Sequence, residues 1–215
     1  MIATDLNHSM TLDTYSILVD ANIHLSKTLR DWIYLLSFAT EEQVYEIFHT
    51  RDIQAEVDYH TRRKFPGADG NLLDRWWKHL EKMTTSKMIT GFTVDPHRAE
   101  YQDFPDPHDL HVVEAARHKP VDALVTNDVG LLTWATDVDD SLHFEVIDAD
   151  SFLMQVVEFT DEGSRLRVLD SQLQYWSQRD QSGYGVDLPG RLTQAGAPLF
   201  AREVQRLLRA RARRL

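Results

Sequence analysis

The segment Tyr15-Ser16-Ile17-Leu18-Val19-Asp20-Ala21-Asn22 gives the clearest indication of the fold class. Its centre, residues 17–19, is a short continuous apolar run with polar neighbours, which is typical of a strand buried on both faces. A second run of this kind occupies residues 123–125 and is followed by Thr126-Asn127-Asp128. Each buried strand is therefore expected to end near an aspartate, Asp20 after the first and Asp128 after the second.

Helical and strand patterns alternate along much of the chain. Apolar residues recur at intervals of three and four in several segments, which predicts helices. We expect these helices at about residues 23–38, 41–49, 52–64, 71–88, 108–118, 130–135 and 150–159, and further strands at 89–94 and 144–147. Because strands that alternate with helices form a parallel sheet covered on both faces, the expected fold class is α/β, a three-layer α/β/α sandwich with a central parallel sheet.

The chain divides into three parts. Residues 1–14 form a polar N-terminal tail, residues 15–159 hold the alternating strands and helices, and residues 160–215 form a helical C-terminal extension. Within the extension we expect a helix at 165–179, a loop rich in glycine and proline at 181–197, and a basic amphipathic helix at 198–215. A length of 215 residues suits one sizeable core with such an appendage.

The composition limits the cellular compartment and the classes of partner that can be expected. There is no cysteine, which excludes disulfides and thiolate metal sites and fits a cytoplasmic protein. No stretch approaches the roughly 20 consecutive apolar residues of a membrane helix, and the polar N-terminus does not resemble a signal peptide. The formal net charge of -11 argues against a protein whose main task is to coat nucleic acid.

Four acidic side chains are expected to meet at one edge of the sheet. Right-handed crossovers place the carboxyl ends of parallel strands on one side, where Asp20 and Asp128 fall and where α/β sheets bind ligands. Glu56 lies on the expected helix 52–64, and Asp109 lies at the start of the helix 108–118. Facing carboxylates repel one another unless a hard divalent cation neutralises them, and such cations are common in enzymes that cut phosphodiesters. A metal-dependent nuclease is therefore the leading hypothesis.

Each acid also has a purely structural interpretation. An aspartate that follows a strand is a good helix N-cap, and a glutamate on a helix is commonly a solvated surface residue. The hypothesis therefore depends on the ordered set of acids and not on any one of them.

Four short motifs follow one another in order over roughly residues 15–150. They are Leu18-Val19-Asp20-Ala21-Asn22, Arg51-Asp52-Ile53-Gln54-Ala55-Glu56-Val57, Asp106-Pro107-His108-Asp109-Leu110-His111-Val112-Val113 and Leu124-Val125-Thr126-Asn127-Asp128. With these motifs the chain resembles a PIN-domain ribonuclease of the bacterial type II toxin–antitoxin kind. The extension after the last motif is a departure from the compact members of that family.

The resemblance implies a PIN-like three-layer fold and cleavage of RNA that depends on Mg²⁺ or Mn²⁺. It assigns catalytic roles to four acids, Asp20, Glu56, Asp109 and Asp128. Three of them, Asp20, Asp109 and Asp128, are expected to be metal ligands. It assigns supporting roles to Asn22, Asp106 and Thr126. Contacts to RNA phosphates are expected from Arg62, Arg63 and Lys64, which follow Glu56 by about two helical turns.

The resemblance also implies partners. The substrate is expected to be RNA, and a single strand is favoured because proteins usually meet accessible bases in loops and ends. A small antitoxin protein is expected to cover the acidic pocket, and family analogy adds a homodimer. No membrane partner is expected.

Two other functions stay open at the level of the sequence. In the first, the acids only hold structure, and the basic final helix binds RNA or a protein without catalysis. In the second, the chain is a different metal phosphoesterase, such as a 5′-nuclease on structured DNA, which would normally need a longer substrate arch. His108 and His111 lack a convincing zinc-ligand spacing, so we interpret them as positional or RNA-contacting residues. Trp76 and Trp77 lie within an apolar helical pattern and are expected to pack in a core or at a dimer contact.

Overall fold

The computed structural model describes residues 14–67, 69–84, 87–179 and 185–214. Five strands form its centre: β1 (Ser16–Val19), β2 (Glu46–Thr50), β3 (Lys87–Ile89), β4 (Ala123–Val125) and β5 (Glu145–Ile147). They make one sheet in the order β3-β2-β1-β4-β5, and every neighbouring pair is parallel. The expected α/β class with a central parallel sheet is confirmed. The expected tail, residues 1–14, lies outside the described residues except for Thr14.

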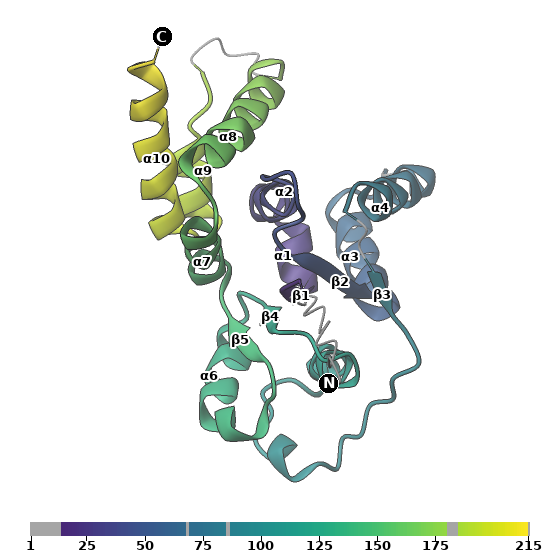
Figure 1. Cartoon of the computed structure of the whole chain (residues 1–215). Helices are drawn as coiled ribbons and strands as arrows, with labels where there is room; N and C mark the ends of the chain where they lie inside the picture. The colour runs from purple at the N-terminus through teal and green to yellow at the C-terminus, as the bar shows by residue number, and fades with distance from the viewer. Residues whose placement is uncertain (1–13, 68, 85–86, 180–184, 215) are drawn as a thin grey trace, which may run out of the picture.

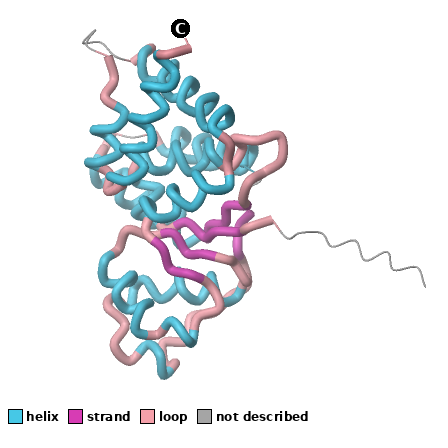
Figure 2. Tube along the Cα trace, turned by 60° about the vertical axis from the view of Figure 1, so that its left-hand side comes forward, coloured by secondary structure: helices cyan, strands magenta, loops and turns pink. Residues whose placement is uncertain are grey.

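Helices cover both faces of the sheet. They are α1 (Ala21–Leu25), α2 (Lys27–Leu36), α3 (Arg51–Lys64), α4 (Gly70–Thr84), α5 (Leu110–His118), α6 (Val129–Asp137), α7 (Ala149–Phe159), α8 (Glu162–Ser177), α9 (Leu188–Gln194) and α10 (Pro198–Ala212). Short 3₁₀ turns are η1 (Ala99–Tyr101), η2 (Pro107–Asp109) and η3 (Asp139–Ser141). Figure 2 shows the strands as a middle layer with helices above and below them. Among the described residues, none of the helices has both the length and the apolar character needed to span a bilayer.

The side chains of β1 alternate between two cores. Ile17 and Val19 belong to a core that also contains residues of α2, α7, α8, α9 and α10. Leu18 belongs to a second core, which residues of α3, α4, α5 and α6 complete. All three side chains are fully buried, because successive side chains of a strand face opposite sides of the sheet. The continuous apolar run is thus explained by a strand that is covered on both faces.

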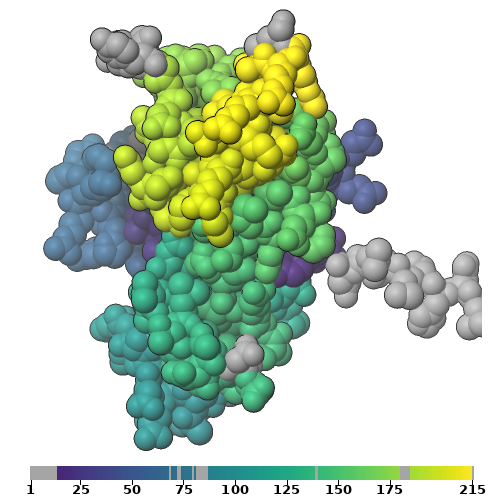
Figure 3. All heavy atoms as spheres, turned by 90° about the vertical axis from the view of Figure 1, so that its left-hand side faces the viewer, coloured from purple at the N-terminus to yellow at the C-terminus, as the bar shows by residue number. Residues whose placement is uncertain are grey.

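The C-terminal helices share the first of these cores. Phe200, Val204 and Leu207 of α10 are fully buried in it. The ring of Phe200 packs edge-on against Trp32 of α2, with 5.1 Å between the ring centroids. Figure 1 shows α9 and α10 beside α7, and Figure 3 shows α10, in yellow, lying against the green part of the chain. The described part of the extension is therefore continuous in packing with the sheet-bearing part.

One expected helix is wrong. The sequence predicted a helix at 41–49, whereas the structure has β2 at Glu46–Thr50, hydrogen-bonded between β1 and β3. Tyr45, Ile47 and Phe48 have the aromatic and β-branched side chains that pack well on a pleated surface. A short apolar run of this kind cannot be assigned to a helix or a strand by periodicity alone.

Two further expectations about element boundaries are also wrong. Helix α4 ends at Thr84 and β3 occupies Lys87–Ile89, so the expected helix to residue 88 and the expected strand at 89–94 are both displaced. Helix α9 lies inside the expected loop 181–197. Pro189 lies in its first turn, where a backbone N–H is not needed, and Asp187 caps it by accepting a hydrogen bond from Gly190 N at 2.8 Å.

The order of the strands creates a switch point between β1 and β4. From β1 the chain moves outward to β2 and β3, and it then returns past β1 to β4 and β5. In open α/β sheets, ligands bind outside the carboxyl ends of the strands at such a point. The residues that follow Val19 and Val125 are therefore the first place to look for function.

Candidate functional site

Asp20 begins the site at the end of β1. It is the N-cap of α1 with an extended backbone, and its Oδ1 accepts a hydrogen bond from Ala21 N at 2.6 Å. Its Oδ2 accepts from Asn22 Nδ2 at 2.6 Å and from Thr126 Oγ1 at 2.7 Å. Asp20 is only 8% exposed, so these donors, and not bulk water, hold its carboxylate in place.

Asn22 and Thr126, the two residues expected to support Asp20, connect the ends of β1 and β4. Asn22 Nδ2 also donates to Thr126 Oγ1 at 2.9 Å. Thr126 is fully buried, and its Oγ1 accepts a further hydrogen bond from Asp128 N at 3.0 Å. The hydroxyl thereby links the carboxylate of Asp20 to the backbone of Asp128.

Asp128 and Asp106 both act as helix caps. The Oδ1 atom of Asp128 accepts from Leu131 N at 2.7 Å at the start of α6, and Asp106 Oδ1 accepts from His108 N at 2.9 Å at the start of η2. These two aspartates therefore do have the structural role of helix N-caps. It does not use all of their oxygens, because a carboxylate can accept about four hydrogen bonds or ligand contacts.

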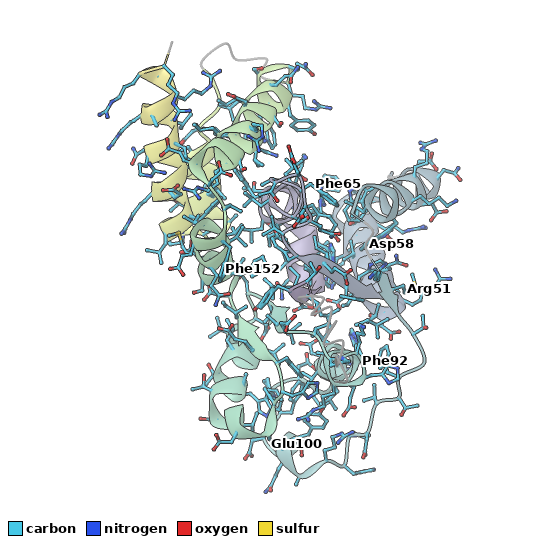
Figure 4. The ribbon with its side chains drawn as sticks, viewed as in Figure 1. Arg51, Asp58, Phe65, Phe92, Glu100 and Phe152 are labelled. Carbon is cyan, nitrogen blue, oxygen red and sulfur yellow. The ribbon has the colours of Figure 1, made fainter. Side chains whose placement is uncertain are left out.

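A second group of side chains comes from α3, η2 and α5. Glu56, Asp109 and His111 each place a ligand atom within 4.8 Å of the other two. Atoms bound to one ion at 2.0–2.6 Å lie at most about 4–5 Å apart, so this group fits around a single divalent cation. Figure 4 labels Arg51 and Asp58, which belong to α3, the helix that carries Glu56.

Burial and mutual repulsion raise the pKa values of the carboxyls. Burial raises the pKa of Asp20 to about 6, and the charges of Glu56 and Asp128 act in the same direction. Burial also raises the pKa of Asp109 to about 6, with further contributions from Asp20, Asp106 and Asp128. The pKa of Glu56 is raised by burial and by Asp109. The ionised forms are thus disfavoured without a cation, and a bound divalent ion would relieve this cost.

His111 is suited to metal binding by its protonation state. Burial lowers its pKa, which favours the neutral imidazole that binds metal ions. Its Nε2 is 4.0 Å from Glu56 Oε2, and its Nδ1 is buried with no hydrogen-bond partner among the described residues. The nitrogen that faces Glu56 is Nε2, and this is the atom that would bind a cation shared with Glu56 and Asp109.

The predicted site residues come together in two connected sets. Hydrogen bonds join Asp20, Asn22, Thr126 and Asp128, whereas Glu56 and Asp109 interact with Asp20 electrostatically. In the described part of the chain, the group with all ligand atoms within 4.8 Å is Glu56, Asp109 and His111. The expected ligand trio of Asp20, Asp109 and Asp128 does not meet that distance there.

His111 is the site residue that the sequence interpretation assigned to a different role. The available signal was its position two residues after Asp109 at the beginning of α5. That signal is weak, because the third member, Glu56, belongs to α3, and only the packing of α3 and α5 on one face of the sheet brings the two together.

The basic residues expected to contact RNA lie apart from the acids. Arg62, Arg63 and Lys64 form the last turn of α3 and are exposed. With a rise of 1.5 Å per residue, Lys64 lies roughly 12 Å from Glu56 along the helix axis. Their positive charge is therefore available near the acidic group without belonging to it.

The tryptophans and the terminal arginines have structural partners. Trp77 is 5% exposed and its Nε1 donates to Asp58 Oδ1 at 3.1 Å, so it packs in the core as predicted. In α10, Arg206 pairs with Glu162 at 2.7 Å and Arg211 pairs with Asp170 at 2.5 Å. A share of the positive charge of this helix is thus neutralised within the molecule.

Comparisons with models of known protein families, with curated proteins and with solved structures each find no match.

Proposed function

We propose that this protein is a divalent-metal-dependent endoribonuclease that hydrolyses RNA phosphodiester bonds. One observation carries the proposal. Asp20 and Asp128 follow β1 and β4 at the switch point of the sheet, the charges of Glu56 and Asp128 help to raise the pKa of Asp20, and the charges of Asp20 and Asp128 help to raise the pKa of Asp109. A buried aspartate and partly buried carboxylates that repel one another at a ligand-binding edge are best explained by a cation that they share. The resemblance of the four motifs to PIN-domain ribonucleases supports the same chemistry.

Glu56, Asp109 and His111 would hold the ion, with Asp20 and Asp128 as neighbouring acids. Carboxylate oxygens suit Mg²⁺ and Mn²⁺, and the imidazole of His111 favours Mn²⁺ over Mg²⁺. When bound, such an ion lowers the pKa of a water molecule and stabilises negative charge on a phosphate. This donor set, with no thiolate in the chain, fits the predicted cofactors.

The other residues of the site position the acidic side chains or attract the RNA substrate. Asn22 and Thr126 orient the carboxylate of Asp20, and the hydroxyl of Thr126 ties it to the backbone of Asp128. Arg62, Arg63 and Lys64 present positive charge to the phosphates of an RNA strand that extends from the acids. Asp106, which caps η2, adds a further charge near Asp109.

The proposal includes a biological setting. In this setting the protein is the toxin of a toxin–antitoxin pair in the cytoplasm. A small antitoxin covers the acidic site, and the assembled form is a homodimer. These parts come from the family resemblance and from the absence of cysteine. The alternative of a non-catalytic module that binds through α10 has less support, because Arg206 and Arg211 are already paired with acids.

Cleavage of RNA by the purified protein tests the proposal. The wild type is expected to cut single-stranded RNA with Mn²⁺ or Mg²⁺ and to stop when a chelator is added. Asp20→Asn is expected to lower the rate by about a hundredfold or more, with thermal unfolding unchanged or improved, because it removes a buried charge that lacks a cation.

A matched control, Asp122, lies at the opposite end of the same two strands. Asp122 Oδ2 accepts from Ser16 N at 2.6 Å, so Asp122→Asn alters an aspartate that also connects β1 and β4 but lies away from the site. This variant is expected to keep its activity. Chelator-resistant cleavage, or cleavage by Asp20→Asn at the wild-type rate, refutes the proposed role of the acids.

A further inference from the structure

The loop after β4 joins the acidic site to the C-terminal helices. Asn127 lies between Thr126 and Asp128, and its backbone N–H donates to Asn22 Oδ1 at 3.0 Å. Its side chain contacts other elements. The Oδ1 atom accepts from Ala149 N of α7 at 3.0 Å, and Nδ2 donates to the carbonyl oxygen of Ala195 at 3.5 Å, a long hydrogen bond.

These contacts fix the orientation of two side-chain amides. The N–H of Asn127 requires an oxygen opposite it, so Asn22 presents its Oδ1 there and its Nδ2 to Asp20 and Thr126. In the same way, the N–H of Ala149 selects Oδ1 of Asn127, which leaves Nδ2 to face a carbonyl. A line of contacts therefore runs from α9 through Asn127 and Asn22 to the carboxylate of Asp20.

The partner of Asn127 is the end of a helix. Ala195 is the C-cap of α9, where helix geometry leaves carbonyl oxygens without helical donors. Gly196 follows with a φ of 92°, and Ala197 N donates back to Leu192 O at 2.9 Å, which closes the helix end. A Cβ on Gly196 would lie 3.1 Å from Nδ2 of Asn127. The backbone conformation thus favours glycine, and a Cβ there would force the side chain of Asn127 to move by a few tenths of an ångström.

The turn between α9 and α10 is also held from a second side. Asp150 of α7 accepts from Leu199 N and from Phe200 N, each at 2.8 Å, and is only 6% exposed. Asp150 follows Ala149, the residue whose N–H binds Asn127. The loop of the site and the turn of the extension are therefore fixed to the same end of α7, which Figure 1 shows beside α9 and α10.

We propose that Asn127 is a positioning residue through which the C-terminal extension sets the geometry of the acidic site. The inference rests on the proposed function in one respect, that the acids hold a divalent cation. The extension completes the site: the carbonyl of Ala195 and the glycine after it hold Asn127, Asn127 holds Asn22, and Asn22 orients Asp20. Asp20 is not one of the three proposed ligands, but its charge acts on the ligand Asp109, so Asn127 affects the ion through Asn22 and Asp20. Groups around the ligands of a metal ion typically change metal affinity or activity 10- to 100-fold when they are removed.

Two variants break the line of contacts at different points. Asn127→Ala removes both side-chain hydrogen bonds, and Gly196→Ala adds a methyl group 3.1 Å from Nδ2. Gly185→Ala is the matched control, because Gly185 lies in the same extension with a φ of 82°, and an added Cβ there meets no described atom within 4 Å. Gly196→Ala and Gly185→Ala introduce comparable backbone strain, but only the first displaces Asn127.

The readouts are Mn²⁺ affinity by calorimetry, the midpoint of thermal unfolding, and RNA cleavage at saturating Mn²⁺. We expect Asn127→Ala and Gly196→Ala to weaken Mn²⁺ binding by about tenfold, the lower end of that range, and Gly185→Ala to bind as the wild type does despite a lowered unfolding midpoint. Wild-type affinity in the first two variants overturns the inference, as does equal weakening by Gly185→Ala. A wild type that binds Mn²⁺ but cuts no RNA refutes the nuclease proposal instead, while the affinity ratios still decide the role of Asn127.

Discussion

At the level of single residues, the surroundings of Asp20 act on its ionised form in two opposite ways. Three short hydrogen bonds favour its ionised form, but burial outweighs them and raises its pKa to about 6. A buried aspartate with this many donors commonly has a low pKa, so the balance here is unusual. Ionisation of Asp20 in the folded protein costs free energy. A bound cation would reduce this cost, and this is the physical reason for the proposed affinity.

This balance predicts the pH dependence of stability. The unfolded chain ionises Asp20 near the ordinary aspartate pKa of 3.8, whereas the folded protein does so only near 6. The free energy of unfolding should therefore fall as the pH rises from about 4 to about 6, because the unfolded state loses its proton first. A shift of about two pKa units corresponds to about 3 kcal/mol.

Urea unfolding in the presence of a chelator measures this effect. Between about pH 4 and pH 6, roughly the span of the two pKa values, the wild type should lose more stability than Asp20→Asn, which cannot ionise at this position. Asp103→Asn, at an exposed position in the loop before η2, serves as control and should follow the wild type. Parallel pH profiles of the wild type and Asp20→Asn would contradict the assigned pKa.

At the scale of secondary-structure elements, helix ends carry much of the architecture. Asp20, Thr50, Asp128 and Asp148 each cap the helix that follows a strand of the sheet, so the ends of β1, β2, β4 and β5 are fixed by one repeated device. The first turn of α10 is different, because its amides are bound by Asp150 of another helix. A cap that joins two helices contributes to tertiary structure as well as to helix formation.

Removal of this tertiary cap should cost more than removal of a local one. Asp150→Ala leaves the amides of Leu199 and Phe200 without their acceptor in a buried place, which should lower the free energy of unfolding by about 2–4 kcal/mol. Asp148→Ala removes only the local cap of α7, where Oδ1 accepts from Ser151 N at 2.9 Å, and should cost about 1 kcal/mol. Chemical denaturation of both variants gives the comparison, and an equal or smaller loss for Asp150→Ala would show that α10 does not depend on α7 for its start.

The elements also show how far the sequence alone could be interpreted. β1 and β4 were predictable because Ile17–Val19 and Ala123–Val125 are buried on both faces and so form unbroken apolar runs. β2 was not, because its run of Tyr45 to Thr50 has no period that separates a strand from a buried helix. Helix α9 was missed because Pro189 and Gly190 suggest a loop, although proline is well tolerated in a first turn.

The site was predictable to the extent that it depends on strand ends. The parallel topology implies that Asp20 and Asp128 lie at the same side of the sheet, and the pairing of β1 with β4, which the sequence did not predict, brings them together with Asn22 and Thr126. The place of His111 beside Glu56 depends instead on how α3 and α5 pack, and side-chain distances of this kind are not encoded in any local pattern. The contact of Asn127 with α9 was equally inaccessible, because the two segments are distant in sequence and α9 was expected to be a loop.

At the scale of the whole molecule, the core on one face of the sheet is built from both ends of the chain. Trp32 of α2 and Phe200 of α10 are in ring contact, and the same core includes Ile17 of β1 and Phe152 of α7, which is labelled in Figure 4. A separate appendage would have a core of its own and would unfold by itself. Here the described part of the extension supplies side chains to the layer that covers the sheet.

This shared core predicts that a change in the extension destabilises the entire protein. Phe200→Ala should lower the free energy of unfolding by about 3–5 kcal/mol, because it leaves a cavity beside Trp32. Tryptophan fluorescence and far-ultraviolet circular dichroism should still report one coincident transition, shifted to lower urea, since a single core unfolds as one unit. Leu199→Ala, at the neighbouring position where the side chain is 47% exposed, should shift the midpoint much less. Two separated transitions, of which only one moves with Phe200→Ala, would instead establish residues 160–215 as an independent domain and would remove the structural basis for a site that is completed by the extension.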